Sequence, residues 1–237
     1  SYIQNYNQEV TPISINLDPA VQDLPYLPDI DIQDYVTVES VVEETGLGPN
    51  GAVIEAADRM INYLDDVKFE IEQYNNPEYV IVDTPGQMEL FSFRNTGPLI
   101  ANALGFGNVK TNIIFCYDSK MCTSPNGFIS TLLLAASVQF RFPSVPLLNV
   151  LTKKDLLSVE QLDKILEWVQ NDFSLQDSIY MEEKGMLKEF TVALERAFRD
   201  FGAISNLLPV SAKYDQDVDQ VFGALQRIFD EYESPYM

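Results

Sequence analysis

The sequence predicts an α/β protein, with a mostly parallel, doubly wound sheet flanked by helices. Short apolar runs rich in β-branched residues alternate with amphipathic stretches of helical period along the 237 residues, and this alternation is typical of parallel β-α-β units. Several of these runs carry no polar alternation, as expected of parallel strands covered on both faces. The length suits one large core, so we expect a single domain over residues 1–237 with a helical insertion at about residues 156–204.

Two strands are predicted in the first half of the chain, and each leads to an acidic residue. Residues 10–15 become apolar and lead to Asp18, and residues 79–82 are continuously apolar and lead to Asp83. Residues 21–34 between them carry two prolines and four aspartates, which predicts a loop without regular structure.

Helices are predicted in the first half where apolar residues recur every three or four positions. For the first of them, Thr37 is a suitable N-cap and Gly46 a suitable C-cap. The remaining helical segments are expected at residues 1–8, 52–74 and 88–104, the last interrupted at Gly97-Pro98.

The second half continues the alternation of strands and helices. Its strands lead to polar motifs, with Asp118 after the first strand and Ser211 after the last. Ser158 and Gln161 occupy capping-box positions at the start of one amphipathic helix. The predicted strands are residues 111–117, 146–152 and 205–210, and the predicted helices are residues 126–140, 158–172, 180–201 and 217–232.

Composition excludes several classes of function. Asp and Glu number 36 against 15 Lys and Arg, a net charge of −21, so we expect nucleic acid and anionic membranes to repel the chain. The absence of histidine excludes Ser-His-Asp and Cys-His catalysis and histidine-bound zinc. Two cysteines, and no run of 18 apolar residues, suit a reduced, cytoplasmic environment.

The segment Asp83-Thr84-Pro85-Gly86-Gln87 has the residue types of a phosphate and metal site. Open α/β sheets bind ligands at the carboxyl ends of their strands, and an acid there can hold Mg²⁺ directly or through water. Gly86 lets a backbone N–H approach a terminal phosphate, and Gln87 could orient an attacking water. The alternative is a core strand followed by an ordinary Pro-Gly turn.

Two further motifs follow predicted strands. They are Thr152-Lys153-Lys154-Asp155 and Ser211-Ala212-Lys213. The Asp155 carboxylate can accept two hydrogen bonds from guanine N1 and N2, which adenine cannot supply, and the alkyl stem of Lys153 could cover the base. The second motif would place a backbone N–H near the O6 atom of that base. Each motif alone is common on surfaces, but their order and spacing favour guanine recognition.

Taken in order, these three motifs resemble the third, fourth and fifth guanine-nucleotide motifs of a GTPase. Gly48-Pro49-Asn50 resembles the signature of the GPN-loop GTPases. Two further segments match the usual sequence of that family, namely Asn16-Leu17-Asp18-Pro19-Ala20 and Gln87-Met88-Glu89-Leu90-Phe91. The resemblance covers essentially the whole chain and implies a P-loop NTPase-like fold and an archaeal-type member. The family's fourth motif often has Asn where this chain has Thr152, but Thr also occurs there, so we expect guanine specificity.

The resemblance also implies a role for each motif residue. Asp18 and Asp83 would surround Mg²⁺, and Gln87 or Glu89 would position the attacking water. Asn50 would enter the partner's phosphate site in a homodimer, or, alternatively, be a turn residue in the left-handed conformation. The implied nucleotide-binding residues are Gly86, donating to the γ-phosphate, with Thr152, Lys153, Asp155, Ser211, Ala212 and Lys213, and the GPN loop is Gly48, Pro49 and Asn50.

The activity that the resemblance implies is hydrolysis of GTP to GDP and phosphate with Mg²⁺, in a homodimer that assists assembly of a protein complex. Eukaryotic relatives are tied to RNA polymerase assembly; no direct nucleic-acid or membrane partner is expected. The alternatives are a catalytically inactive dimeric scaffold of the same fold and an ATP-using relative, which Asp155 disfavours. Arg59 and Arg94 could be arginine fingers, but a helical arginine is more often solvated or an ion-pair partner.

One motif of the family has no counterpart before Asn16, namely the Gly-rich phosphate loop that ends in Lys and Ser or Thr. The strand that precedes this loop would be central in a doubly wound sheet, so its absence would leave two unpaired inner edges. We therefore expect the natural protein to carry roughly 20 residues before Ser1. We expect a chain that begins at Ser1 to bind GTP weakly or not at all.

Overall fold

The computed structural model describes residues 11–75, 77–105, 109–171, 173–204 and 206–231. The chain divides into two compact units, residues 1–109 and 110–237. The helix end predicted at residues 1–8 lies outside the described residues.

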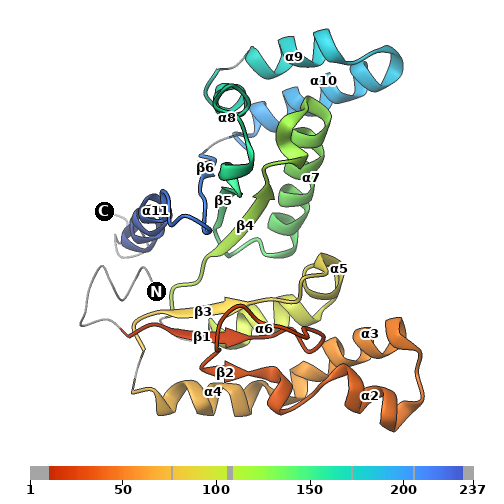
Figure 1. The fold of residues 1–237 in the computed structure, drawn as a ribbon, viewed down its shortest axis with the longest axis vertical. Helices are drawn as coiled ribbons and strands as arrows, with labels where there is room; N and C mark the ends of the chain where they lie inside the picture. Colours follow the sequence, from red (N-terminus) through yellow and green to blue (C-terminus); the bar gives the residue numbers. More distant parts are fainter. Residues whose placement is uncertain (1–10, 76, 106–108, 172, 205, 232–237) are drawn as a thin grey trace. The chain divides into compact units, whose positions relative to one another are not determined.

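In the first unit, three parallel strands form a sheet in the order β2-β1-β3 (Figure 1). The strands are β1 (Ile13–Asn16), β2 (Ile30–Asp31) and β3 (Val80–Asp83). The pairing of β1 with β3 places Asn16 opposite Asp83, so the carboxyl ends of the two strands are level. Ile13, Ile15 and Leu17 are almost wholly buried in the core of this unit.

We expected an irregular loop over residues 21–34, but the last residues of this segment form regular structure, so the prediction is wrong there. Residues 30–31 form β2, and the 3₁₀ turn η1 (Ile32–Asp34) follows directly. Ile30 and Ile32 are buried, whereas the Asp29 carboxylate accepts hydrogen bonds from the Ser14 backbone N–H at 2.7 Å and hydroxyl at 2.8 Å. The acidic residues thus anchor this segment to β1, because their carboxylates pair with groups that the strand presents.

The helices of the first unit follow the predicted ranges with two differences. In α2 (Val38–Thr45) the Thr37 hydroxyl caps the start, and Gly46, at φ +69°, ends the helix, as predicted. The prediction of one long helix at residues 52–74 is wrong. The chain forms α3 (Pro49–Arg59) and α4 (Leu64–Gln73), and the 3₁₀ turn η2 (Met60–Tyr63) separates them. The tighter turn keeps Met60 and Leu64 buried.

Residues 88–104 form two helices, α5 (Met88–Phe91) and α6 (Thr96–Leu104). The break precedes Gly97-Pro98, because Pro98 falls in the first turn of α6, where its missing N–H is not needed. A Cβ atom on Gly97 would lie 2.2 Å from the Phe91 carbonyl oxygen. Glycine at this position therefore permits the close approach of α6 to the end of α5.

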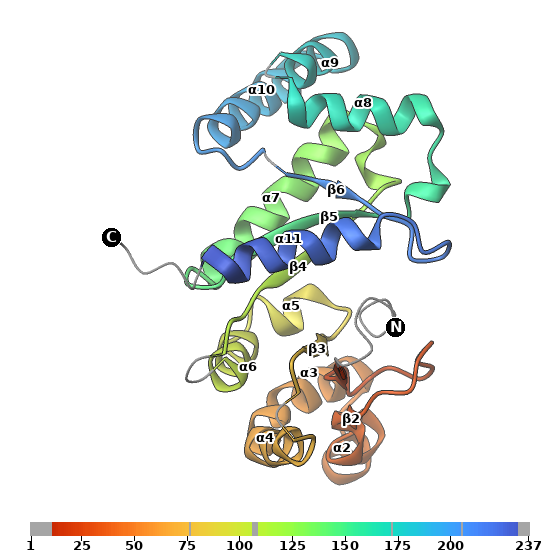
Figure 2. The same cartoon turned by 90° about the vertical axis from the view of Figure 1, so that its left-hand side faces the viewer.

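In the second unit, β4 (Ile113–Asp118), β5 (Leu147–Thr152) and β6 (Leu208–Pro209) form another parallel sheet in that order. The register places Asp118 opposite Thr152. Helices α7 (Pro125–Arg141) and α11 (Val218–Glu231) lie on opposite faces of this sheet (Figure 2). On the α11 side, Leu148 and Val150 pack against Val210 and Ala224.

Three helices occupy the stretch where the sequence predicts an insertion. They are α8 (Val159–Gln170), α9 (Ser174–Glu182) and α10 (Gly185–Asp200). Both capping-box hydrogen bonds of Ser158 and Gln161 are present, as predicted. The single helix expected at residues 180–201 is wrong: α9 ends at Glu182 and α10 begins at Gly185, whose φ of +64° interrupts the helical conformation.

Two strands are more exposed than the sequence predicts. Val80 and Ile81 of β3 are 38% and 49% exposed, and Ile114 of β4 is 44% exposed, although both strands were expected to be buried. Among the described residues, β3 and β4 each pair with another strand along one side only. Each therefore presents a sheet edge with apolar side chains.

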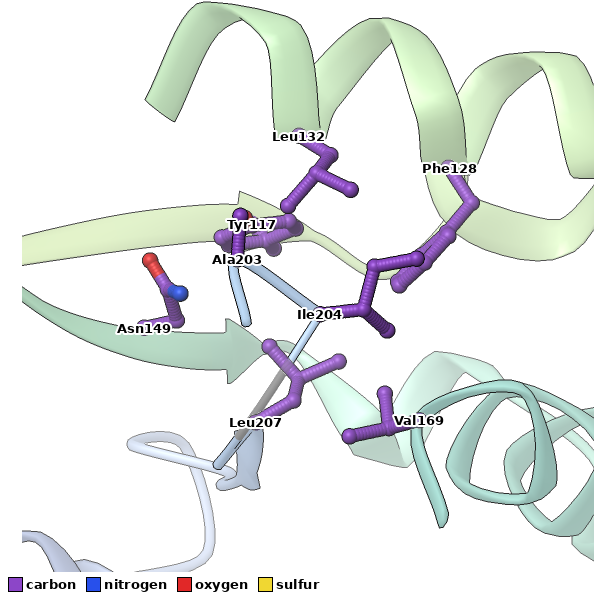
Figure 3. A pocket seen from close by; sticks show the side chains of 8 residues that line it. All are labelled: Tyr117, Phe128, Leu132, Asn149, Val169, Ala203, Ile204 and Leu207. Carbon is purple, nitrogen blue, oxygen red and sulfur yellow. The ribbon is translucent and has the colours of Figure 1, made fainter. Parts of the chain in front are cut away.

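A cavity of about 10 Å³ in the second unit lies between the sheet, α7 and the chain before β6 (Figure 3). It is mostly apolar, but the Tyr117 hydroxyl and the Asn149 Oδ1 atom are buried there without a hydrogen-bond partner among the described residues. A space of this size suits about one water molecule and excludes a nucleotide base. Among the described helices, none is long and apolar enough to cross a membrane.

Candidate functional site

In the first unit, the residues after β1 and β3 bring together a carboxylate and a glycine that the sequence singled out. The Asp18 Oδ2 atom accepts a hydrogen bond from the Gly86 backbone N–H at 3.2 Å, and Oδ1 accepts one from the Ala20 N–H at 2.9 Å. The Leu17 N–H donates to the Asp83 carbonyl oxygen at 2.8 Å, which keeps the two chain segments parallel beyond the strands. Asp18, Asp83 and Gly86 therefore lie together, as predicted.

Two side chains that the sequence analysis did not assign hold this arrangement. Asn16 is fully buried, donates from Nδ2 to Asp31 at 2.8 Å and accepts from the Asp18 N–H at 3.0 Å. The Tyr26 hydroxyl donates to the Asp83 carboxylate at 2.8 Å. Burial, together with this hydrogen bond, raises the pKa of Tyr26 above its ordinary value, so the hydroxyl remains a donor at neutral pH. The sequence signal that could have identified Asn16 is the presence of a polar residue at the end of an apolar strand.

Gln87 and Glu89, the candidates for positioning water, lie at the start of α5. Gln87 is the N-cap residue and Glu89 is in the first turn. Both residues are exposed, and they lie one and three positions after Gly86.

The Gly-Pro-Asn segment forms the N-terminus of α3 instead of a free-standing turn. Gly48 is the N-cap in an extended conformation, Pro49 is the first helical residue and Asn50 is the second. Asn50 is outside the left-handed region, which excludes the alternative reading of this residue. The first helical hydrogen bond runs from the Ala52 N–H to the Gly48 carbonyl at 2.9 Å, so the N–H groups of Asn50 and Gly51 precede it and have no intrahelical partner.

All three residues of the GPN loop are exposed. The exposed N–H groups and the helix dipole make this end of α3 electropositive. A groove of about 480 Å³ adjoins it, lined by Ala20, Gln22, Val38, Glu39, Val42, Glu43, Pro49 and Val53.

Arg59 and Arg94 are ion-pair partners. Arg59 donates to Glu55 at 2.9 Å and to Glu44 at 2.5 Å, and Arg94 holds Asp58 through Nε at 2.9 Å and Nη2 at 2.5 Å. These contacts favour the structural reading of both arginines over a role as arginine fingers.

In the second unit, the end of β5 carries a second cluster of predicted residues. The Thr152 hydroxyl donates to the Tyr117 carbonyl at 3.0 Å, and Lys153 adopts a left-handed conformation at φ +58° before the 3₁₀ turn η4 (Lys154–Leu156). The Lys153 ammonium donates to the Asp118 carboxylate at 2.7 Å and holds the pKa of that carboxyl below its usual range. Ser119 donates to the Lys153 carbonyl at 2.9 Å, so residues after β4 fix the position of the lysine.

Asp155 is held by the motif that follows β6. The buried Ser211 hydroxyl donates to Asp155 Oδ1 at 2.6 Å, and the Lys154 N–H donates to the Val210 carbonyl at 3.0 Å. Ser211 and Gln216 exchange two backbone hydrogen bonds that close the turn containing Ala212 and Lys213, and both of these residues are exposed. Thr152, Lys153, Asp155 and Ser211 thus lie together, as the spacing predicts. Asp118 and Ser119 were not assigned in advance, although Asp118 ends a predicted strand.

The first cluster suits Mg²⁺ in one respect. Among the described residues, no three His, Cys, Asp or Glu side chains gather closely enough to hold a metal by themselves. Mg²⁺ usually takes only one or two protein carboxylates and fills its other positions with water and phosphate oxygens. The two carboxylates of Asp18 and Asp83 fit that requirement.

Comparison with known proteins agrees with these motifs. A family whose description reads "Conserved hypothetical ATP binding protein" matches residues 1–231. GPN-loop GTPase 3 of Kluyveromyces lactis is 31% identical over 220 residues, which cover 90% of this chain and 79% of that protein. GPN-loop GTPase 1 of Dictyostelium discoideum is 27% identical over 232 residues, which cover 98% of this chain but only 57% of that protein.

The fold is also similar to a solved structure. A crystal structure of a GTPase from Pyrococcus abyssi in its apo form matches with a TM-score of 0.82 at 25% identity, over 96% of this chain and 89% of that one. This likeness confirms the predicted α/β fold with parallel strands and flanking helices. From the matched motifs, the family match and these relatives, the chain belongs to the family of GPN-loop GTPases.

Proposed function

We propose that the protein containing this chain binds GTP and hydrolyses it to GDP and phosphate, and that it works as a cytoplasmic homodimer. The observation that carries the proposal is the pair of clusters at the carboxyl ends of the strands. One presents acids and a glycine N–H, and the other presents a carboxylate held by a serine. The names of the relatives support the same activity.

The cluster of the first unit has the chemistry for the phosphate end of the nucleotide. The Gly86 N–H now donates to Asp18 at 3.2 Å, and a γ-phosphate oxygen would take over this donor. Asp18 and Asp83 would hold Mg²⁺, which, when bound, neutralises charge on the phosphate oxygens. Gln87 or Glu89 would orient the attacking water, because both are exposed beside Gly86.

The cluster of the second unit has the chemistry for the base. Asp155 has one oxygen held by the Ser211 hydroxyl at 2.6 Å, which orients the carboxylate to accept from guanine N1 and N2. The Lys153 stem, fixed by Asp118, would cover one face of the base, and the Ala212 N–H would meet O6. Adenine would leave this acid without donors, so ATP is disfavoured despite the wording of the family description.

Asn50 is proposed to act on the partner subunit's nucleotide. It is exposed on a helix N-terminus whose N–H groups and dipole favour an anion. Arg59 and Arg94 already form ion pairs, so we propose Asn50 instead of either arginine as the group offered to a phosphate. A client complex, with RNA polymerase assembly as the family precedent, is part of the same proposal.

Release of phosphate from GTP and ATP by the protein tests the activity. We expect release from GTP only, and we expect Asp83→Ala to lower the rate by about 10²–10³ because an electrostatic contact to the reacting phosphates is lost. Asp65→Ala, which removes a carboxylate from the exposed side of α4, is the matched control and should leave the rate unchanged. Equal release from ATP, or an unaffected Asp83→Ala protein, would contradict the proposal.

A complementation experiment tests whether Asn50 acts between subunits. Asn50→Ala and Asp83→Ala proteins are each expected to be nearly inactive. Random exchange of subunits in an equal mixture would give one intact site in each mixed dimer, and so about a quarter of the wild-type rate. Asn62→Ala, another exposed asparagine of the first unit, should behave as wild type. If the mixture is no more active than its two components, Asn50 does not act in trans.

The second candidate is a dimeric scaffold without turnover. The exposed apolar residues of β3 and β4 favour it, because the described sheet edges offer backbone groups and apolar side chains to another segment. A protein that dimerises but neither binds nor hydrolyses GTP would establish this alternative.

A further inference from the structure

Helix α10 has two apolar faces, and only one of them packs within the second unit. Thr191, Val192 and Glu195 are buried on the side that contacts α7 and α9. The opposite side carries Met186, Phe190, Ala193 and Ala197, all of them exposed. Met186 is 86% exposed and Phe190 is 59% exposed. A second apolar face on an amphipathic helix needs an explanation beyond the core of its own unit.

The four exposed residues recur at intervals of four, three and four, which is the spacing of a coiled-coil seam. We propose that this stripe is a contact between two copies of the chain, in which two α10 helices pack antiparallel. The contact does not depend on the proposed GTPase activity, and it uses residues separate from the GPN loop.

Size complementarity selects the antiparallel register. When Phe190 of one copy packs on Ala193 of the other, Met186 packs on Ala197 at the next layer, and the two-fold symmetry repeats both pairs. Each layer then matches a large side chain with a methyl group, and the small residues let the helices approach closely. A parallel pair would instead place Phe190 on Phe190 and Ala193 on Ala193, leaving one layer crowded and the next layer underfilled.

The residues that flank the seam complement each other in the same register. Glu189 of one copy falls beside Arg196 of the other, and symmetry makes this ion pair twice. On the opposite flank, Leu187, which is 54% exposed, meets Leu194. Glu189 and Arg196 are both exposed. In the parallel arrangement Glu189 would face Leu194 instead of an opposite charge, which favours the antiparallel pair by charge complementarity.

The contact is expected to be weak. The 16 residues of α10 extend over about 24 Å, which is short for a helix pair, and each copy carries a net charge of −21. Long-range repulsion between the copies falls as salt is added. We therefore expect association to strengthen between low and moderate ionic strength, opposite to what an association based on surface ion pairs alone would show.

Sedimentation equilibrium of the chain, up to millimolar concentration, tests the proposal. We expect concentration-dependent association, separate from the homodimer proposed through the GPN loop, that Phe190→Asp weakens at least tenfold. Glu189→Arg and Arg196→Glu each place like charges opposite one another twice, so each should weaken association by about tenfold. The double variant, Glu189→Arg with Arg196→Glu, should restore it.

Glu167→Arg, on the exposed side of α8, is the matched control, because it changes net charge as Glu189→Arg does but lies off the stripe. Circular dichroism of each variant verifies that α10 still forms. Association that Phe190→Asp leaves unchanged, no association beyond the GPN-loop homodimer at any concentration or salt, or a double variant no better than the single ones would each overturn the proposal.

Discussion

Replacing Asp155 with alanine is expected to weaken binding of GDP to the protein by about 10²–10⁴-fold, because two hydrogen bonds to a charged acceptor are lost. Binding of ADP should be unchanged, so the preference for guanine would largely disappear. Titration calorimetry with GDP and ADP measures both affinities. We expect a large loss of affinity for GDP because the Asp155 carboxylate is already oriented. The Ser211 hydroxyl donates a hydrogen bond to its Oδ1 atom at 2.6 Å.

Two variants make this experiment specific. Asp163→Ala removes an exposed acid from α8 and should alter neither affinity. Ser211→Ala leaves the carboxylate but removes the group that orients it, so it should weaken GDP binding by about tenfold. If Asp155→Ala binds GDP as tightly as wild type while its thermal unfolding is unchanged, Asp155 does not read the base.

Replacing Trp168 with alanine is expected to destabilise the second unit by about 3–5 kcal/mol, since a large buried aromatic side chain leaves a cavity. Trp168 is fully buried, its ring lies 5.6 Å from that of Phe128, and its Nε1 atom donates to the Ser178 hydroxyl at 2.9 Å. It therefore joins α8, α7 and α9. Urea denaturation followed by circular dichroism measures the loss.

The conservative variant Trp168→Phe separates packing from hydrogen bonding. It keeps most of the aromatic contact but removes the bond to Ser178, so a loss of about 1–2 kcal/mol is expected. If the free energy of unfolding of the Trp168→Ala protein falls by less than about 1 kcal/mol, other contacts hold α7, α8 and α9 together.

The strands that end in acids were predictable from the sequence for a simple physical reason. A buried parallel strand needs a continuous apolar run, and a polar motif directly after it must emerge at the sheet edge. Asp83 and Asp155 were located in this way. Ser211 was placed near Asp155 because successive parallel strands end on the same edge.

Short elements and helix breaks were not predictable by the same means. The strand β2 has two residues, too few for any periodicity, and its pairing with Ile15 and Asn16 of β1 defines it. The break between α9 and α10 depends on the left-handed conformation of Gly185, and a single glycine within a helical pattern is an ambiguous signal.

Partners of site residues depend on tertiary contacts. Tyr26 lies 57 positions before Asp83, and Lys153 lies 35 positions after Asp118. No local pattern in the sequence connects such pairs, because they meet only when the strands pair. The same holds for the exposure of β3 and β4, which depends on what adjoins their edges.

The position of Trp168 has a practical consequence for following the protein by spectroscopy. It is the only tryptophan in the 237 residues, so the intrinsic indole fluorescence originates within residues 110–237. An optical probe for ligand-induced change around Asp18 and Gly86 would have to be introduced there, and its signal could then be read independently of the native emission.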